Sequence, residues 1–165
     1  MWMQRQLSLE AIVPDAHPDP DPVIRLAPLD HKGEPEYEYR TRKQVKTAVR
    51  KENGLVSEYQ RWLGRSGRKL NVVSYKGLRC DAYEQDRANL IEAKCATNRE
   101  YIRMAVGQLL DYSYLGEEQF DKPNLAILVP KRPKQALLDW LATLNIYAIW
   151  KERSKFEDNA EGRFT

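Results

Sequence analysis

Two β-type runs are joined by a short polar turn in the stretch LRCDAYEQDRANLIEAKC, which spans Leu78–Cys95. A turn at Asp86-Arg87 would pair the two runs as antiparallel strands. This register places Asp81 directly across from Glu92, with their Cβ atoms about 4.5–5.5 Å apart. Two carboxylates at that separation repel each other, so the pair should lower stability unless a cation binds between them.

Outward from this hairpin, hydrophobic periodicity and turn residues predict further helices and strands. Helices are predicted over 41–63, 98–115 and 133–144, and strands over 70–75, 78–83, 89–95, 125–129 and 146–150. Strands joined by a short turn should be antiparallel, whereas strands separated by a helix should be parallel with right-handed crossovers. The sequence therefore predicts an α/β fold, a mixed central β-sheet flanked by helices with an α-β-β-β-α-β core and a further α-β unit.

Charge is distributed unevenly, which suggests three regions. We expect a Pro-rich acidic arm over 1–40, a folded domain over 41–152 and a polar C-terminal tail over 153–165. Residues 1–39 carry three Lys/Arg and eight Asp/Glu, whereas residues 40–69 carry ten Lys/Arg and two Asp/Glu. A basic block this dense favours contact with a polyanion such as nucleic acid, and a solvated helix face is the alternative. The arm is a candidate surface for a homodimer or a partner protein.

Composition excludes several classes of protein. The 165 residues are 42% hydrophobic and 31% charged, which is typical of a globular chain. No apolar run reaches the roughly 18 residues of a membrane span, and the first residues do not resemble a signal peptide. Only two cysteines and two histidines are present, and His17 and His31 both lie in the Pro-rich stretch. A zinc site or a histidine-based mechanism is therefore not expected, and a reducing cytoplasm is the default compartment.

The strand after the turn carries a lysine beside its acid. Lys94 follows Glu92 by two residues, so both point to one face of the strand with Leu90. A lysine in an otherwise apolar strand needs a partner, and an acid pair holding a hard divalent cation through oxygen atoms would provide one. A purely structural ion pair is the alternative. Glu52 projects into the apolar face of the first helix, where it needs either such a site or a bond to an Arg, Tyr or backbone group.

The second predicted helix carries Gln108 and Tyr112, which lie four residues apart on one stripe. An amide at that position can orient a lysine, a water molecule or a phosphate. An ordinary boundary amide and a core tyrosine remain the alternative interpretation.

These motifs together resemble the PD-(D/E)XK nuclease superfamily. Asp81, Glu92-Ala93-Lys94 and the element Gln108-Leu109-Leu110-Asp111-Tyr112 follow a helix that carries Glu52, in an order similar to that of the family. The Gln-x-x-x-Tyr element is similar to the RecB-type branch, and the resemblance spans residues 41–150. One departure is Cys80, which stands where many members have proline.

The resemblance implies a restriction-endonuclease-like fold and a nuclease that hydrolyses DNA phosphodiester bonds with Mg²⁺ or Mn²⁺. Asp81, Glu92 and the main-chain carbonyl of Ala93 would hold the ion, and Glu52 would bind through water or hold a second ion. Lys94 would orient or help deprotonate the attacking water, supported by Gln108 and Tyr112. The residues that would then follow a nucleic-acid backbone are Lys43, Lys46, Arg50, Arg65, Arg68 and Lys69.

Such an enzyme would serve processes such as restriction, repair or mobile-element processing. A catalytically silent nucleic-acid-binding or assembly module of the same fold is the second interpretation. No motif in the sequence suggests a nucleotide cofactor.

Overall fold

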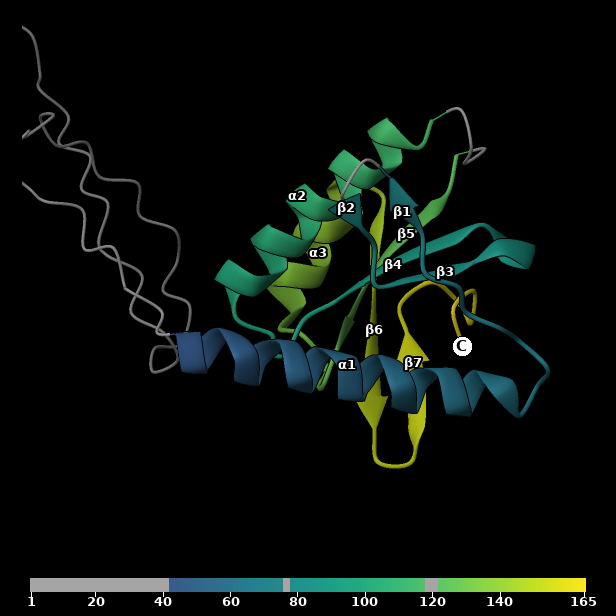
Figure 1. Ribbon diagram of the computed structural model, residues 1–165, viewed down its shortest axis with the longest axis horizontal. Helices are drawn as coiled ribbons and strands as arrows, with labels where there is room; N and C mark the ends of the chain where they lie inside the picture. The colour runs from purple at the N-terminus through teal and green to yellow at the C-terminus, as the bar shows by residue number, and fades with distance from the viewer. Residues whose placement is uncertain (1–41, 76–77, 118–121) are drawn as a thin grey trace, which may run out of the picture. The chain divides into compact units, whose positions relative to one another are not determined.

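The computed structural model of the chain describes residues 42–75, 78–117 and 122–165 (Figure 1). The chain divides into two units, residues 1–40 and 41–165, and all described residues belong to the second. The predicted Pro-rich arm over 1–40, and the partner surface expected on it, lie outside the described residues. No helix in the described part is both long enough and apolar enough for a membrane span.

The described chain contains three α-helices, one short 3-10 helix and seven strands. In order they are α1 (Arg42–Gly64), β1 (Ser74–Tyr75), β2 (Leu78–Arg79), β3 (Ala82–Glu84), η1 (Gln85–Arg87), β4 (Asn89–Ala93), α2 (Arg99–Leu115), β5 (Asn124–Val129), α3 (Gln135–Thr143), β6 (Ile146–Glu152) and β7 (Lys155–Asp158). The three predicted helices are confirmed, with boundaries that differ by one or two residues.

Five strands form the main sheet in the order β3-β4-β5-β6-β7. β4, β5 and β6 are mutually parallel because α2 and α3 make the crossovers, whereas β3 and β7 are antiparallel to their neighbours. β5 lies at the centre, and its apolar run Leu125–Val129 is buried throughout, as expected for a strand covered on both faces. The prediction of a mixed sheet flanked by helices is confirmed.

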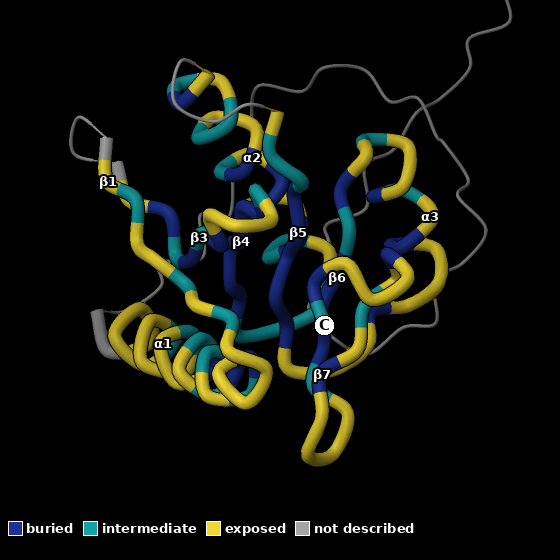
Figure 2. The backbone as a smooth tube through the Cα atoms, turned by 90° about the vertical axis from the view of Figure 1, so that its right-hand side faces the viewer, coloured by how far each residue is buried: buried dark blue, intermediate teal, exposed yellow. Residues whose placement is uncertain are grey.

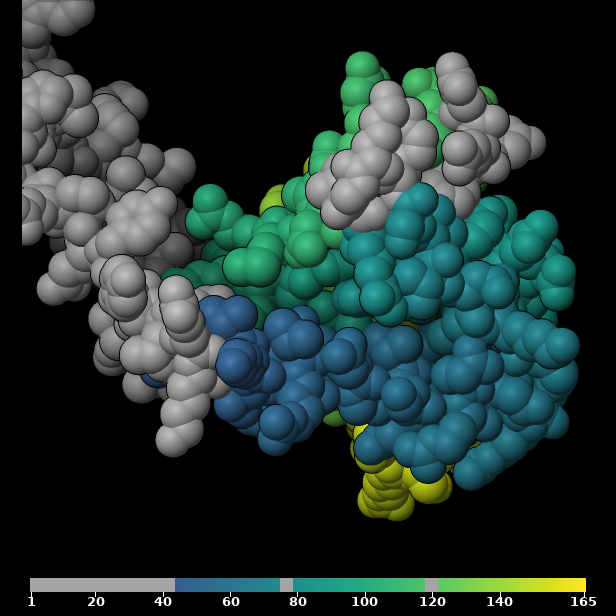
Figure 3. All heavy atoms as spheres, viewed as in Figure 1, coloured from purple at the N-terminus to yellow at the C-terminus, as the bar shows by residue number. Residues whose placement is uncertain are grey.

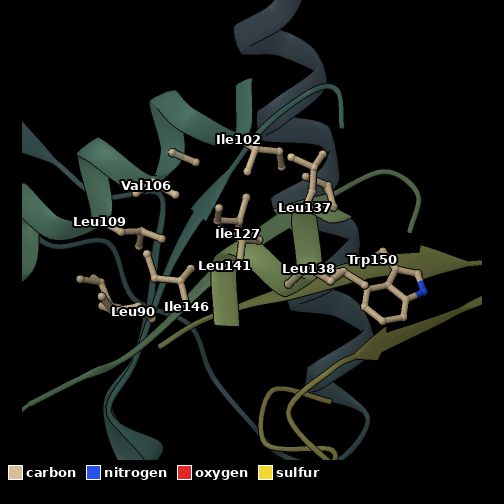
Figure 4. Close-up of a cluster of buried hydrophobic side chains, with 14 of the residues drawn as sticks. Leu90, Ile102, Val106, Leu109, Ile127, Leu137, Leu138, Leu141, Ile146 and Trp150 are labelled. Atoms are coloured by element: carbon tan, nitrogen blue, oxygen red, sulfur yellow. The ribbon is translucent and has the colours of Figure 1, made fainter. Parts of the chain in front are cut away.

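Helices cover the two faces of this sheet, which gives three layers (Figures 1 and 2). On one face α2 and α3 pack over a cluster that includes Leu90, Ile127 and Ile146 (Figure 4). On the other face α1 and the C-terminal residues pack over a cluster that includes Ile91 and Ala93. Successive residues of β4 therefore point alternately into the two cores.

The β3–β4 hairpin has the predicted register. Its pairs are Glu84 with Asn89, Tyr83 with Leu90 and Ala82 with Ile91. Tyr83 packs against the α2 side and Ala82 against the α1 side. The ladder ends at the Ala82–Ile91 pair, and Asp81 lies in the bend before β3, so the predicted Asp81–Glu92 pair is not one of its rungs.

The two runs before this hairpin are shorter than predicted. The strand expected over 70–75 contributes only a bridge between Asn71 and Tyr83, followed by β1, and the strand expected over 78–83 is interrupted between β2 and β3. β1 and β2 pair with each other outside the main sheet. Val72 is half exposed, so the first run lacks the covered apolar face that would hold a longer strand in place.

The prediction of a polar tail over 153–165 was wrong, because this segment completes the α1 core. It contains β7, and Phe156 and Phe164 are both buried. The Asp158 carboxylate accepts backbone N–H bonds from Ala160, Gly162 and Phe164, so it fixes the final turn. The domain therefore extends through the last residue of the chain. Two aromatic residues among polar ones carry no periodic signal, which explains the error.

The apolar face predicted for the first helix is covered only in its second half. Tyr59 and Leu63 are buried against the sheet, together with Leu55. Helical spacing also assigns Val45 and Val49 to this apolar face, but each is 48% exposed, so that assignment does not bury them. The first turns of α1 extend beyond the residues that form this core.

Candidate active site

A buried ion pair lies at the carboxyl end of β4. Glu92 is 2% exposed and Lys94 is 4% exposed, and the Lys94 Nζ donates to Glu92 Oε1 at 2.6 Å. Burial and the neighbouring Asp81 charge raise the pKa of Glu92 to about 7, even though the bond from Lys94 acts in the opposite direction. Glu92 therefore exchanges a proton near neutral pH, which few carboxyl groups do.

Asp81 lies beside this pair, in the bend that precedes β3. Its Oδ2 accepts the backbone N–H of Ala93 at 2.9 Å. The bond links Asp81 to the residue between Glu92 and Lys94, so the predicted approach of Asp81 to the second strand is confirmed. The charge of Asp81 is also among the causes of the raised Glu92 pKa, which places the two carboxylates in one electrostatic environment.

Glu52 reaches the same end of β4 from α1. Its Oε1 accepts the backbone N–H of Cys95 at 3.2 Å. Burial raises the pKa of Glu52, Lys94 lowers it and Asp81 raises it, so Glu52 shares the electrostatic environment of both residues. The predicted inward projection of Glu52 is confirmed, and one of its oxygens has the backbone partner that the structural alternative requires.

Gln108 and Tyr112 approach from α2. Gln108 Nε2 lies 3.5 Å from Tyr112 Oη, and burial raises the pKa of Tyr112, followed by the charge of Glu92. Tyr112 is therefore close enough to Glu92 to sense its ionisation. The predicted site residues from α1, β4 and α2 are thus brought to one place.

Two buried oxygen atoms at this place, Glu92 Oε2 and Gln108 Oε1, have no hydrogen-bond partner among the described residues. Unpartnered buried oxygens are costly, so they indicate a position that a water molecule, a cation or a substrate group completes. Within the described residues no three Asp, Glu, His or Cys side chains are grouped closely enough to hold a metal ion by themselves. Magnesium commonly uses only one or two carboxylates and takes its other ligands from water and phosphate, so the Asp81–Glu92 donor set fits such an ion.

The basic residues predicted to contact nucleic acid have different surroundings. Lys46, Arg50, Arg65 and Lys69 are exposed, and the side chain of Lys43 lies outside the described residues.

Arg68 is the exception, because its guanidinium is already occupied. Its Nε and Nη2 donate to the two oxygens of Glu84 at 2.6 and 2.8 Å. We therefore remove Arg68 from the predicted contacts with nucleic acid. Glu84 also accepts from Asn89 Nδ2 at 2.8 Å, so this group is a structural network.

A cleft lined by other residues than those of the candidate active site was not anticipated from the sequence. A cleft of about 430 Å³ is lined by Trp62, Arg65, Ser66, Arg68, Arg87 and Thr165. Its residues come from the end of α1, the β3–β4 turn and the end of the chain. No spacing in the sequence links these three segments, because the cleft depends on the packing of the C-terminal residues that were expected to form a free tail.

Comparisons with protein-family models, with curated proteins and with solved structures gave no match for this chain.

Proposed function

We propose that the protein is a metal-dependent nuclease with a restriction-endonuclease-like fold that hydrolyses phosphodiester bonds of DNA. The observation that carries the proposal is the buried Glu92–Lys94 pair beside Asp81, in which Glu92 keeps one oxygen without a partner. A structural ion pair would be expected to satisfy both oxygens, as other buried carboxylates do. An unsatisfied and proton-exchanging acid is instead typical of a reactive site.

Asp81 and Glu92 would hold Mg²⁺ or Mn²⁺, with the Ala93 main-chain carbonyl and Glu52 as further oxygen donors. When bound, the cation would acidify a water molecule and neutralise charge on the phosphate. Lys94, which donates to Glu92 at 2.6 Å, would orient the attacking water or help deprotonate it. Gln108 and Tyr112 would position Lys94 and the scissile phosphate from the α2 side.

The exposed cations of α1 and the following loop would position the DNA backbone without reading its sequence. These are Lys46, Arg50, Arg65 and Lys69, with Lys43 in the first turns of the same helix. The compartment that we propose is the cytoplasm, where the free thiols of Cys80 and Cys95 would remain reduced.

A catalytically silent nucleic-acid-binding module is the second candidate. It is favoured by the ion pair itself, because Lys94 already occupies Glu92 Oε1, and by the lack of a three-residue metal cluster in the described part of the chain. In such a module the Glu92–Lys94 pair would only stabilise the end of β4.

A cleavage assay separates the two candidates. Supercoiled, linear and single-stranded DNA, and RNA, are incubated with the protein and either Mg²⁺ or Mn²⁺. We expect DNA cleavage that is lost with chelator and that falls about 100-fold or more in Lys94→Ala, because proton transfer contributes at least that factor. Lys151→Ala is the matched control, since it removes a lysine from the more exposed ion pair with Glu58.

Cleavage that survives in Lys94→Ala at the wild-type rate would show that this pair does not act in hydrolysis. A wild-type protein that binds DNA without cutting it, and whose melting temperature does not rise with either metal, would support the silent module.

A further inference from the structure

The cleft at the end of α1 has the size of a small-molecule binding site. Its volume of about 430 Å³ lies within the range usual for ligand pockets. It is lined by residues from the end of α1 and the loop after it, from the β3–β4 turn and from the end of the chain. α1 crosses the face shown in Figure 3, and Trp62 follows Glu52 by ten residues. The cleft therefore lies about 15 Å along the helix from the candidate active site.

The lining of the cleft is strongly cationic. Arg65, Arg68 and Arg87 all contribute to it. Glu84 pairs with Arg68 at 2.6 Å, and the charge of Asp158 also acts on Arg68. Burial by itself would raise the pKa of Glu84, but the bonds from Arg68 and Asn89 outweigh it and the pKa is lowered. Glu84 is therefore ionised at neutral pH, and its partners are Arg68 and, at 3.9 Å, Arg87. Arg65 has no acidic partner among the described residues, so an anionic ligand would be attracted to the side of the cleft that Arg65 and Arg87 line.

The three arginines have separate roles. Arg68 donates four hydrogen bonds within the protein. Two go to Glu84, one to the Arg163 carbonyl and one to the Thr165 carbonyl. Arg68 lines the cleft, but few of its N–H donors remain available to a ligand. Arg87 is exposed, with a side chain 48% accessible, and makes one bond to the Arg163 carbonyl at 3.2 Å. Arg65 is exposed, and its guanidinium has no polar partner among the described residues.

Trp62 adds a rigid aromatic wall. Its ring is stacked on Tyr59 at a centroid distance of 6.4 Å and packs against Phe156 at 5.7 Å. Trp62 is only partly buried, and it is one of the residues that line the cleft. A fixed aromatic surface next to two cations matches a nucleotide, because bases stack on aromatic rings and arginine pairs with phosphate through two parallel bonds.

We propose that this cleft binds a nucleotide, with the phosphate between Arg65 and Arg87 and the base against Trp62. The nucleotide is either free or the phosphorylated end of a nucleic-acid strand. The assignment needs no hydrolysis at the Asp81–Glu92 site, so it is tested without a divalent metal.

Titration calorimetry on the full chain in EDTA tests this site. The probes are adenosine monophosphate, adenosine, inorganic phosphate, and a dinucleotide with and without a 5′-phosphate. We expect the phosphorylated nucleosides to bind more tightly than either adenosine or phosphate alone. If the 5′-phosphorylated dinucleotide binds more tightly than adenosine monophosphate, the cleft binds strand ends. If the two bind with equal affinity, the cleft binds free nucleotides.

Arg65→Ala and Arg87→Ala should each weaken binding by about tenfold, which is the usual contribution of one charge-assisted hydrogen bond. Arg103→Ala is the charge-matched control, because Arg103 is an exposed arginine of α2 outside the cleft. Trp62→Leu should reduce nucleotide affinity to that of inorganic phosphate, and circular dichroism verifies that the variant is folded.

Three results would overturn the assignment. They are the absence of nucleotide binding at millimolar concentration, an equal loss in Arg103→Ala, and a wild-type affinity for the nucleotide no greater than that for inorganic phosphate. Because EDTA abolishes any metal-dependent cleavage, these results leave the nuclease proposal unaffected, and an inactive nuclease leaves the binding result unaffected.

Discussion

Glu84 and Glu92 belong to neighbouring strands and are exposed to nearly the same extent, yet their chemistry is opposite. They are 1% and 2% exposed, and they lie in β3 and β4 of one hairpin. Glu84 points to the α1 face and Glu92 to the α2 face, as the alternation of the two strands requires. The pKa of Glu84 is lowered, whereas the pKa of Glu92 is raised to about 7.

The difference comes from the number of donors that each carboxylate has. Glu84 accepts two bonds from Arg68 and one from Asn89, so its charge is stabilised in the folded state. Glu92 accepts one bond from Lys94, keeps Oε2 without a partner and lies near a second carboxylate. Nearly equal exposure thus accompanies a structural ion in one case and a reactive acid in the other. Glu92 lies deeper in the protein and has fewer donors, so the exposed fraction alone does not distinguish the two.

The largest expected effect is the loss of stability when Glu84 is neutralised. At pH 6 in EDTA, Glu84→Gln should lower the free energy of unfolding by about 3–5 kcal/mol, because Arg68 is left as a buried charge without its counterion. Glu92→Gln should change it by about 1 kcal/mol or less, because the raised pKa means that the folded state gains little from the charge of Glu92. Urea unfolding followed by circular dichroism measures both values. Equal losses of unfolding free energy in Glu84→Gln and Glu92→Gln would show that the two carboxylates do not differ in their contribution to stability.

The next effect concerns the pH dependence of stability. Glu92 has a folded pKa of about 7 against an ordinary value of 4.5, so the folded state binds the proton more tightly than the unfolded state. The free energy of unfolding should therefore fall as pH rises from about 4.5 to 7, by up to about 3 kcal/mol from this group. Glu92→Gln removes that decline, so its stability relative to wild type should rise across the same interval.

Glu84 should show the opposite dependence. Its folded pKa is lowered, so its contribution is present above the ordinary carboxyl pKa and is lost as pH falls through the folded value. The difference in stability between wild type and Glu84→Gln should be constant above about pH 5 and shrink in acid. Unfolding curves collected from pH 4 to 8 in EDTA measure both trends. A Glu92→Gln difference that does not change with pH would show that Glu92 titrates normally.

Most of the fold could be predicted because its signals are local. The period of the three helices, the apolar run of β5 and the short turn at Asp86-Arg87 each depend on neighbouring residues, and the register of the hairpin followed from its turn. The errors arose where distant segments decide the outcome. Phe156 and Phe164 are buried only because α1 supplies the other side of their core.

The candidate site could be predicted in part for the same reason. Glu92 and Lys94 share a face through strand alternation, and Asp81 follows from the hairpin register. The sequence could not show that Arg68 pairs with Glu84, sixteen residues away, or that Glu92 and Gln108 each keep an oxygen without a partner. Those facts depend on the side-chain packing of three layers, and they separate a structural acid from a reactive one.

The smallest expected effect is a change in stability at two glutamines. It tests the same difference between a buried oxygen that has a hydrogen-bond partner and one that has none. Gln108 has a buried Oε1 without a partner, whereas the Oε1 of Gln60 accepts the backbone N–H of Leu70 at 2.9 Å. Gln108→Leu should therefore raise the free energy of unfolding by about 1 kcal/mol, because it removes an unsatisfied polar group. Gln60→Leu should lower it by about 1 kcal/mol, because the Leu70 N–H loses its acceptor.

Cleavage measured on the same two variants shows whether the unsatisfied oxygen serves function. A site under selection for activity retains groups that cost stability, so Gln108→Leu should cut DNA more slowly while being more stable. Gln60→Leu should cut at the wild-type rate, since Gln60 lies outside the candidate site. If Gln108→Leu instead proved less stable than wild type, the Oε1 atom would have a partner in solution. Gln108 would then differ from Glu92, which keeps an oxygen without a partner among the described residues.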